Sequence, residues 1–264
     1  MIGGIDFASS QLTSIYNSNS EQLSSTLSKI ASGKKFQNAS EDLIGFIRST
    51  KIGLEIDGYD QVKQNLTNFK TYTSAAVQAG SSLYENLSKM KSLAEKYAGT
   101  SDTDLQSEYA AEFETLRKQV SSTLSNSSVD GINITTSGSS LKKADLNPEG
   151  TGSLDLNFTA SAVAANITAF DITDTDIVTD IQAEIDNTLT YLSEAKSFDN
   201  IASQQLKLTD TIINSKQAVK SLITDIDDAK EMNNALDQSV RQQAAISMMA
   251  QANMSRQSIV KLYM

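Results

Sequence analysis

The sequence predicts a mainly α-helical fold: a long antiparallel coiled-coil or helical-bundle rod, with a small β-rich patch in the middle of the chain and both termini paired as helices. Apolar residues recur at heptad spacing over long stretches of the 264 residues. The chain contains a single proline, Pro148, and proline is the residue that most strongly interrupts a helix. Ser, Thr, Gly and Asn gather in one central stretch, where the helical pattern stops.

The stretch from Leu43 to Tyr97 is expected to form one long helix. In its clearest part, apolar and small residues alternate in steps of four and three without a slip, which places them on one narrow stripe suited to a coiled-coil seam. The stripe consists of Val62, Leu66, Phe69, Thr73, Ala76, Gly80, Leu83, Leu87, Met90, Ala94 and Tyr97. Its small central residues permit a close approach of another helix. Gly99 and the polar residues after it end the helix.

A second, shorter helix is expected to follow and to complete a helical hairpin. Its apolar residues lie mostly three or four apart: Leu105, Tyr109, Phe113, Leu116, Val120 and Leu124. The pattern then changes over residues 129–170, where Ile132–Ile134 and Leu154–Phe158 alternate apolar and polar side chains, as half-buried strands do. We expect a small β-rich, exposed patch here, with turns around Gly138 and Asn147–Gly152.

Helix is expected to return at Asp174 or Thr175 and to continue to about residue 226. The two ends of the chain, Met1–Ile30 and Ala235–Met264, have sparse apolar residues and few charges. Each can form an amphipathic helix, but neither stripe is large enough to be stable alone. The ends therefore need each other or a partner chain, and an antiparallel bundle would bring them together.

The composition argues against an enzyme and against a resident metal or cofactor. Cys and His are both absent, which removes thiol nucleophiles, imidazole bases and most transition-metal sites. The acidic residues Asp171, Asp174, Asp176 and Asp180 lack the glycine and the spacing of a calcium loop. Helix capping is the preferred interpretation of this cluster.

The net charge of −10 and the pI near 4.6 argue against nucleic acid and against an anionic membrane surface as partners. No apolar run approaches the roughly 20 residues that span a bilayer. Met1–Ser20 has neither the basic nor the apolar region of a secretory signal peptide. These tests alone predict a cytoplasmic protein, an expectation that the following resemblance replaces.

Two segments resemble bacterial flagellin. Leu27–Phe36, running on to Ala39–Asp42, is similar to the family's L-x-x-L-S-S-G-x-R-I-N-x-A-x-D-D. Val240–Asn253, followed by Ser258–Tyr263, is similar to Q-Q-A-x-x-S-x-L-A-Q-A-N and the closing V-L-x-L-L. Ile223–Glu231 resembles I-E-D-A-D-Y-A-T-E with the Tyr replaced. The first segment departs from the pattern by having Ile, Ala, Lys and Phe for the usual Leu, Ser, Arg and Ile.

The resemblance implies that different parts of the chain have different roles. Residues 1–43 and 224–264 would pair as the terminal helical polymerisation domain that forms the inner tube of a filament. Residues 44–223 would form the rod domain, including the exposed β-rich segment. The resemblance also implies export through the flagellar type III apparatus without a cleaved signal. The expected location is therefore outside the cell, in the flagellar filament.

A filament subunit would have identical subunits as its main partners. Weak terminal helices that fold against neighbouring copies couple ordering to assembly, and a head-to-tail contact that does not close produces a helical filament. The residues expected to make these self-assembly contacts are Leu12, Leu23, Leu27, Ile30, Val240, Ile246, Met249, Ile259 and Leu262. The resemblance further implies an export chaperone at the C-terminal helix, and hook-associated and cap proteins as partners.

In flagellins sensed by Toll-like receptor 5, an Arg, a Leu and a Glu on the rod domain are important. The resemblance places Lys89, Leu93 and Glu112 at these positions as a possible innate-receptor surface. Lys in place of Arg loses the planar, bidentate guanidinium.

Two alternatives stay open at this point. A hook–filament junction protein shares the terminal architecture but adapts the filament instead of polymerising. A secreted binding module or effector could use similar coiled coils, and its ends would tolerate deletion.

Overall fold

The computed structural model describes residues 2–136, 138–159 and 161–263, and the side-chain burial of these residues except 2–9, 138–141, 256, 259, 260, 262 and 263. The elements in chain order are α1 (Ile2–Ser32), α2 (Leu43–Gly99), α3 (Thr103–Asn126), β1 (Ser128–Val129), β2 (Ile132–Asn133), β3 (Gly138–Asp145), β4 (Ser153–Phe158), the 3₁₀ turn η1 (Ile167–Ala169), α4 (Ile177–Thr224) and α5 (Asp228–Tyr263). The prediction of a mainly α-helical fold with a small β-rich middle is confirmed.

The chain divides into two compact units. The terminal unit contains residues 1–54 and 216–264, and the central unit contains residues 55–215. Both divisions fall inside long helices, α2 and α4. The predicted polymerisation and rod domains divide instead at residues 43/44 and 223/224, and the roles assigned to those two ranges stay predictions.

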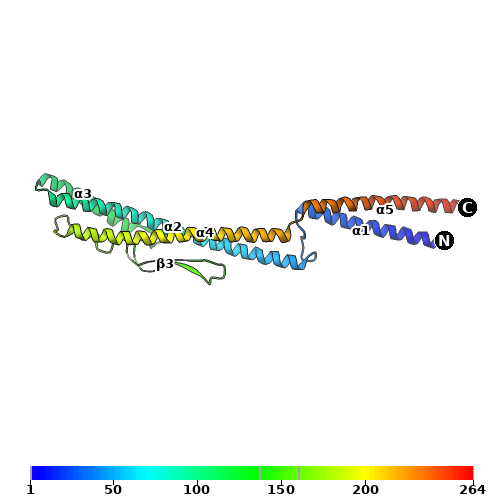
Figure 1. Cartoon of the computed structure of the whole chain (residues 1–264), viewed down its shortest axis with the longest axis horizontal. Coiled ribbons are helices and arrows are strands. Elements are labelled where there is room, and N and C mark those ends of the chain that lie inside the picture. The colour runs from blue at the N-terminus through cyan, green and yellow to red at the C-terminus, as the bar shows by residue number, and fades with distance from the viewer. Residues whose placement is uncertain (1, 137, 160, 264) are drawn as a thin grey trace. The chain divides into compact units, whose positions relative to one another are not determined.

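The terminal unit is built on a pair of long helices. α1 and α5 pack along each other and bring the two ends of the chain to the same end of the pair (Figure 1). The predicted pairing of the termini is confirmed. The first residues of α2 and the last residues of α4 complete this unit.

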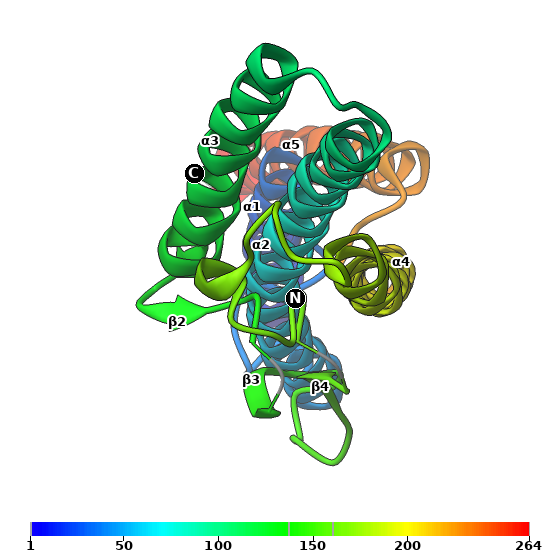
Figure 2. The ribbon, with the colours of Figure 1, turned by 90° about the vertical axis from the view of Figure 1, so that its left-hand side faces the viewer.

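The central unit has a continuous apolar core. In the view of Figure 2, α2 lies between α3 and α4, with the β3–β4 hairpin below α2. The predicted heptad stripe of α2 supplies much of this core, including the fully buried Leu66, Leu83 and Leu87. The Phe69 and Phe198 rings meet edge-on with centroids 6.5 Å apart, and this contact joins α2 to α4.

Tyr191 on α4 is the largest fully buried side chain of the described chain. Its ring lies over Gly80 of α2, where an added Cβ would come within 3.2 Å of the ring. The small residue in the middle of the stripe therefore admits an aromatic ring from the neighbouring helix. The Tyr191 hydroxyl donates a hydrogen bond to the carbonyl of Ile134 at 2.6 Å, which anchors the segment after β2 to the core. Burial raises the pKa of this hydroxyl.

The β-rich patch consists of two antiparallel hairpins. β1 and β2 are joined by Asp130 and Gly131, which both have positive φ, at 50° and 76°. Two such residues are typical of a type I′ turn. β3 pairs with β4, so Gly138, expected in a turn, instead begins a strand. Residues 138–145 have no strand-like apolar alternation, and pairing with β4 makes them a strand.

The turn between β3 and β4 contains Pro148, as expected for Asn147–Gly152. Pro148 packs against Gly58 of α2, where an added Cβ would lie only 2.8 Å from the Pro148 Cβ. The missing side chain at Gly58 is what lets the hairpin turn approach the helix this closely.

The link from β4 to α4 is held by two carboxylates of α4. Glu194 accepts the backbone N–H of Thr159 at 2.9 Å. Glu184, which is buried, accepts the N–H groups of Ala164 at 2.7 Å and Ala165 at 3.1 Å. These bonds fix a segment that has little regular structure of its own.

α4 begins at Ile177, later than the predicted start at Asp174 or Thr175. The Asp171 carboxylate accepts both the N–H and the hydroxyl of Thr173, at 2.9 and 2.8 Å. Hydrogen bonding of this kind stabilises a turn in competition with helix. Part of the acidic cluster therefore shapes the entry to α4.

Candidate functional site

Exposed apolar side chains are concentrated in the terminal unit. Among the residues whose burial the structure describes, the buried apolar side chains of this unit are only Phe36, Ala235 and Ala245. The exposed large apolar side chains are, in the terminal unit, Ile15, Leu27, Leu43, Ile44, Phe46, Ile47, Leu54, Val219, Leu222, Met232, Leu236, Val240, Ile246, Met248 and Met254, and, in the central unit, Tyr84, Leu105, Leu189 and Leu208. Apolar surface gathered in one region indicates an interaction site.

The nine predicted self-assembly residues occupy two kinds of position. Half-buried side chains of the α1–α5 pair are Leu12, Leu23, Ile30 and Met249. Exposed side chains are Leu27, Val240 and Ile246, at 51%, 63% and 49%. Ile259 and Leu262 lie outside the residues whose side chains are described. The structure thus brings these residues into one unit, while their role in assembly stays a prediction.

One contact shows directly how the half-buried group is placed. The Thr13 hydroxyl of α1 lies 3.9 Å from the Met249 sulfur of α5, within reach of a weak hydrogen bond. Met249 therefore faces the partner helix. On α5, the buried residues Ala235 and Ala245 mark the same side of the helix.

The opposite side of α5 carries an apolar stripe, of which sequence reasoning assigned only Val240 to a site. Its members are spaced by four, four and fourteen residues, a pattern that repeats on one side of a helix. Between 51% and 63% of each side chain is exposed. We call Met232, Leu236, Val240 and Met254 the outer stripe of α5. The spacing of these apolar residues is visible in the sequence, but only the position of α1 shows which side of α5 stays uncovered.

The outward side of α1 is different, because it is polar. Glu21, Ser24, Ser25 and Ser28 are all exposed there. They line a shallow groove together with residues of the connection that follows α1, and Gln37 of that connection donates a hydrogen bond to the Ser28 hydroxyl at 3.2 Å. The α1–α5 pair therefore presents one apolar and one polar surface.

A second apolar region lies at the start of α2. Leu43, Ile44, Ile47 and Leu54 are each more than half exposed, between 57% and 68%. Sequence reasoning placed these residues in a helix but assigned them no contact. Leu222 near the end of α4 is the most exposed large apolar side chain described, at 76%.

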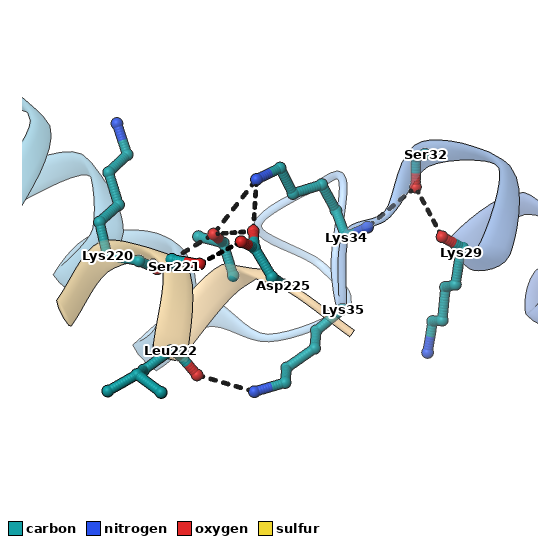
Figure 3. Close-up of polar contacts among 9 residues, drawn as sticks. Lys29, Ser32, Lys34, Lys35, Lys220, Ser221, Leu222 and Asp225 are labelled. Atoms are coloured by element: carbon teal, nitrogen blue, oxygen red, sulfur yellow. Dashed lines mark hydrogen bonds and ion pairs between the residues drawn. The ribbon is translucent and has the colours of Figure 1, made fainter. Parts of the chain in front are cut away.

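The connection between α1 and α2 lies against the break between α4 and α5. Gly33 ends α1 with a φ of 67°, and its carbonyl accepts the N–H of Ile226 at 3.2 Å. The Lys35 N–H donates to the carbonyl of Thr224 at 2.7 Å. The Lys35 ammonium also donates to the carbonyl of Leu222 at 2.8 Å (Figure 3). Two segments from opposite ends of the sequence are thereby joined through their backbones.

Side chains strengthen this connection, which we call the clasp. The Lys34 ammonium lies 2.5 Å from the Asp225 carboxylate (Figure 3). The hydroxyls of Ser221 and Thr224 also donate to that carboxylate, the second at 2.8 Å. The Lys34 ammonium, helped by the two hydroxyls, holds the pKa of Asp225 far below its usual range. Asp225 is therefore charged at any ordinary pH.

Two further side chains fix the path of the chain into α2. Phe36 is 8% exposed and packs over Gly45, where an added Cβ would come within 2.7 Å of the Phe36 ring. The Asp42 carboxylate accepts the N–H of Gly45 at 2.9 Å, the geometry of a helix N-cap. Asp42 and Gly33, both part of the flagellin-like motif, thus have defined structural roles.

Nothing among these residues resembles a catalytic or metal centre. The described residues include no group of three acidic side chains arranged to hold a metal ion. In the described part of the chain, no helix has both the length and the apolar content needed to cross a membrane.

The predicted receptor residues do not share one kind of environment. Lys89 and Glu112 are exposed, on α2 and α3. Leu93 is 5% exposed and belongs to the core of the central unit. Only Lys89 and Glu112 are therefore available on the surface of the isolated chain, and the receptor surface stays a prediction.

Comparison with known protein families decides what kind of protein carries these features. The N-terminal helical region of bacterial flagellin matches residues 6–137, and the C-terminal helical region matches residues 175–263. The chain belongs to the bacterial flagellin family. Flagellins are structural proteins of the extracellular flagellar filament, and the resemblance in the terminal motifs is confirmed. In this chain, the segment between the two matches contains the β3–β4 hairpin and the link to α4.

Among solved structures, this chain is similar to a protein described as flagellar hook-associated, from Vibrio parahaemolyticus. The two share 16% sequence identity with a TM-score of 0.47, over 70% of this chain and 97% of that chain. No curated protein sequence has a significant match to this chain.

Proposed function

We propose that the chain is a structural subunit that self-assembles into the bacterial flagellar filament for motility, and that it performs no enzymatic reaction. The apolar surface of the terminal unit carries this proposal. A unit with three described buried apolar side chains and many exposed ones has an incomplete core. Identical copies that pack together would complete it, because each copy brings the same uncovered surface.

The unequal sides of the α1–α5 pair favour a filament over a closed dimer. The outer stripe of α5 is apolar, whereas the outward side of α1 carries Glu21, Ser24 and Ser28. If the outer stripe packs on a different surface of the next copy, the contact is head-to-tail and can repeat. A repeating contact that does not close produces a helical polymer.

Within this proposal the nine predicted assembly residues act in two ways. Leu27, Val240 and Ile246 contact neighbouring copies, since they are exposed on the isolated chain. Leu12, Leu23, Ile30 and Met249 hold α1 against α5 and so prepare that surface. Ile259 and Leu262 extend the contact along the C-terminal part of α5.

The proposal includes export and accessory partners. The chain would leave the cell through the flagellar type III apparatus, with an export chaperone covering α5 until assembly. The exposed apolar residues of α5 support this, because they need cover in the unassembled protein. Hook-associated and cap proteins would bind the ends of the polymer. Nucleic acid and membranes are not proposed as partners of a chain with net charge −10.

Imaging of purified protein after salt-induced assembly tests the proposal against its alternative. Long filaments in negative stain are expected of a filament subunit. A hook–filament junction protein would give no filaments under the same conditions, and that result would favour the alternative.

Deletion of residues 245–264 gives the matching loss-of-function test. We expect polymerisation to be abolished, because about half of α5 is removed, while the helical signal of the central unit remains in circular dichroism. An unchanged yield of filaments would refute the proposed role of the terminal unit.

A further inference from the structure

The sulfur atoms of the chain are gathered on the terminal unit. The protein has seven methionines and no cysteine, so thioethers are its only sulfur chemistry. Met232, Met248, Met249 and Met254 all lie on α5, whereas Met90 is fully buried in the central core. From this distribution we infer that the exposed α5 methionines are an oxidation site, at which peroxide-class oxidants convert the thioether to the sulfoxide and block self-assembly. The inference rests on the proposed function.

The exposed methionines are placed where a change of polarity has the largest effect on assembly. Met232 and Met254 stand at the two ends of the outer stripe of α5, 51% and 62% exposed. Met248, 56% exposed, lies to one side of the stripe. Each sulfur is therefore reachable by a small oxidant in the unassembled chain. In a polymer that buries the outer stripe, the same atoms would be covered by a neighbour.

The reaction needs no group from the protein. A sulfur lone pair attacks one oxygen of a peroxide such as H₂O₂, the O–O bond breaks, and an S–O bond forms. Proton transfer to the departing oxygen releases water, so the thioether is oxidised by two electrons and the peroxide is reduced. The product is a polar, chiral sulfoxide in place of a flexible apolar side chain.

The apolar thioether favours burial in a contact between copies, and the polar sulfoxide opposes it. The S=O oxygen is a strong hydrogen-bond acceptor, and burying such a group without a donor is unfavourable. Val240 and Leu236, the other members of the outer stripe, offer no donor from their side chains. Oxidation of Met232 and Met254 would therefore place at each end of the stripe an acceptor that those two apolar side chains cannot satisfy.

Peptide mapping by mass spectrometry, without any assembly step, tests the site itself. After limited peroxide treatment of the unassembled full chain, we expect sulfoxide at Met232, Met248 and Met254 well before Met90. Met249, half-buried against Thr13, should react more slowly than the exposed three. Equal rates at Met90 and at the exposed methionines would overturn the inference, because they would indicate oxidation of unfolded protein.

Assembly assays with matched variants test the consequence. We expect oxidised wild-type protein to need about a tenfold higher concentration for filament formation. The triple variant Met232→Leu, Met248→Leu, Met254→Leu conserves volume and apolarity. Whatever concentration this variant needs for filament formation, peroxide treatment should leave that concentration unchanged. Met90→Leu is the control and should stay sensitive. Enzymatic reduction of the sulfoxides should restore wild-type assembly.

The results separate this inference from the proposed function. Oxidised wild type that assembles as well as untreated protein would overturn the inference and leave the filament function intact. A triple variant that assembles but remains peroxide-sensitive would likewise overturn it. If untreated wild type and untreated triple variant both fail to form filaments, the proposed function fails, and the inferred effect on assembly fails with it.

Discussion

The terminal and central units are both built from long helices, yet they treat apolar side chains in opposite ways. In the central unit the large side chains of α2, α3 and α4 meet in one core that includes Leu66, Leu83, Val120 and Tyr191. In the terminal unit most described large apolar side chains face outward. Helix formation therefore does not by itself mean a finished fold. The central unit buries its apolar side chains within one chain, whereas the terminal unit leaves apolar surface exposed for further packing.

The same contrast appears within a single helix. The outward side of α2 is apolar at Ile44 and Ile47 in the terminal unit. In the central unit most of its exposed positions, such as Gln61 and Gln64, are polar, and Tyr84 is the exception among its large apolar side chains. α2 is continuous from Leu43 to Gly99, so the difference lies in the side chains and not in the backbone. The apolar part marks where α2 is expected to meet another copy.

The largest expected effect comes from removing one buried leucine. Leu83→Ala in the central core should lower the free energy of unfolding by about 2–5 kcal/mol, because it leaves a cavity. Leu222→Ala, at a 76% exposed position of the terminal unit, should change it by less than about 0.5 kcal/mol. Urea unfolding followed by circular dichroism measures both. Filament yield should fall for Leu222→Ala although the variant keeps its normal stability. Equal losses of stability in the two variants would contradict the contrast between the two units.

Two glycines of α2 allow a smaller and more local test. At Gly53, in the terminal unit, an added Cβ meets only the mobile end of Lys220 at 3.1 Å, so Gly53→Ala should gain about 0.5–1 kcal/mol from helix propensity. At Gly58, in the central unit, the Cβ would press on Pro148, and displacing the hairpin turn should produce a net loss of about 1–2 kcal/mol. Thermal unfolding of the two variants measures the opposite signs. A stabilising Gly58→Ala would show that the turn moves freely.

The smallest expected effect concerns the clasp and its response to pH. Asp225 has a folded pKa below its ordinary value of about 3.9, so the charged form stabilises the fold above that value. This contribution is lost as the pH falls through the folded pKa. Asp225→Asn should therefore show weaker amide protection at Lys35 than wild type from pH 8 to pH 5, with the difference shrinking below about pH 4. Hydrogen exchange measures this protection. A difference in protection that grows as the pH falls below about 4 would contradict the direction given for the Asp225 pKa shift.

Much of the helical fold could be predicted because the buried residues of α2 recur in alternating steps of four and three residues. A stripe such as Val62–Tyr97 identifies both the helix and its buried side. β3 could not be predicted, because Lys142 and Lys143 break the apolar alternation and the strand exists only through pairing with β4. The start of α4 was missed because the side chain of Asp171 forms a local turn.

The candidate site was only partly predictable. The terminal motifs identified Val240 and Leu27, both of which are exposed. Met232 and Leu236 were missed, since their spacing alone does not say which side of α5 is covered by α1. The apolar start of α2 was missed for the opposite reason: Ile44 and Ile47 look like ordinary core residues until the structure places them outside. The apolar stripes can be recognised in a single sequence, but only the packing of the helices shows which of these stripes remain exposed.

The way Glu184 and Glu194 hold the link before α4 has a consequence for how this segment can vary. Their carboxylates bind main-chain N–H groups of Thr159, Ala164 and Ala165, which every residue except proline possesses. The side chains at these three positions can therefore change without loss of these anchors. Substitutions other than proline should be tolerated at these three exposed positions more readily than at the two glutamates, whereas proline at any of the three would remove an anchor.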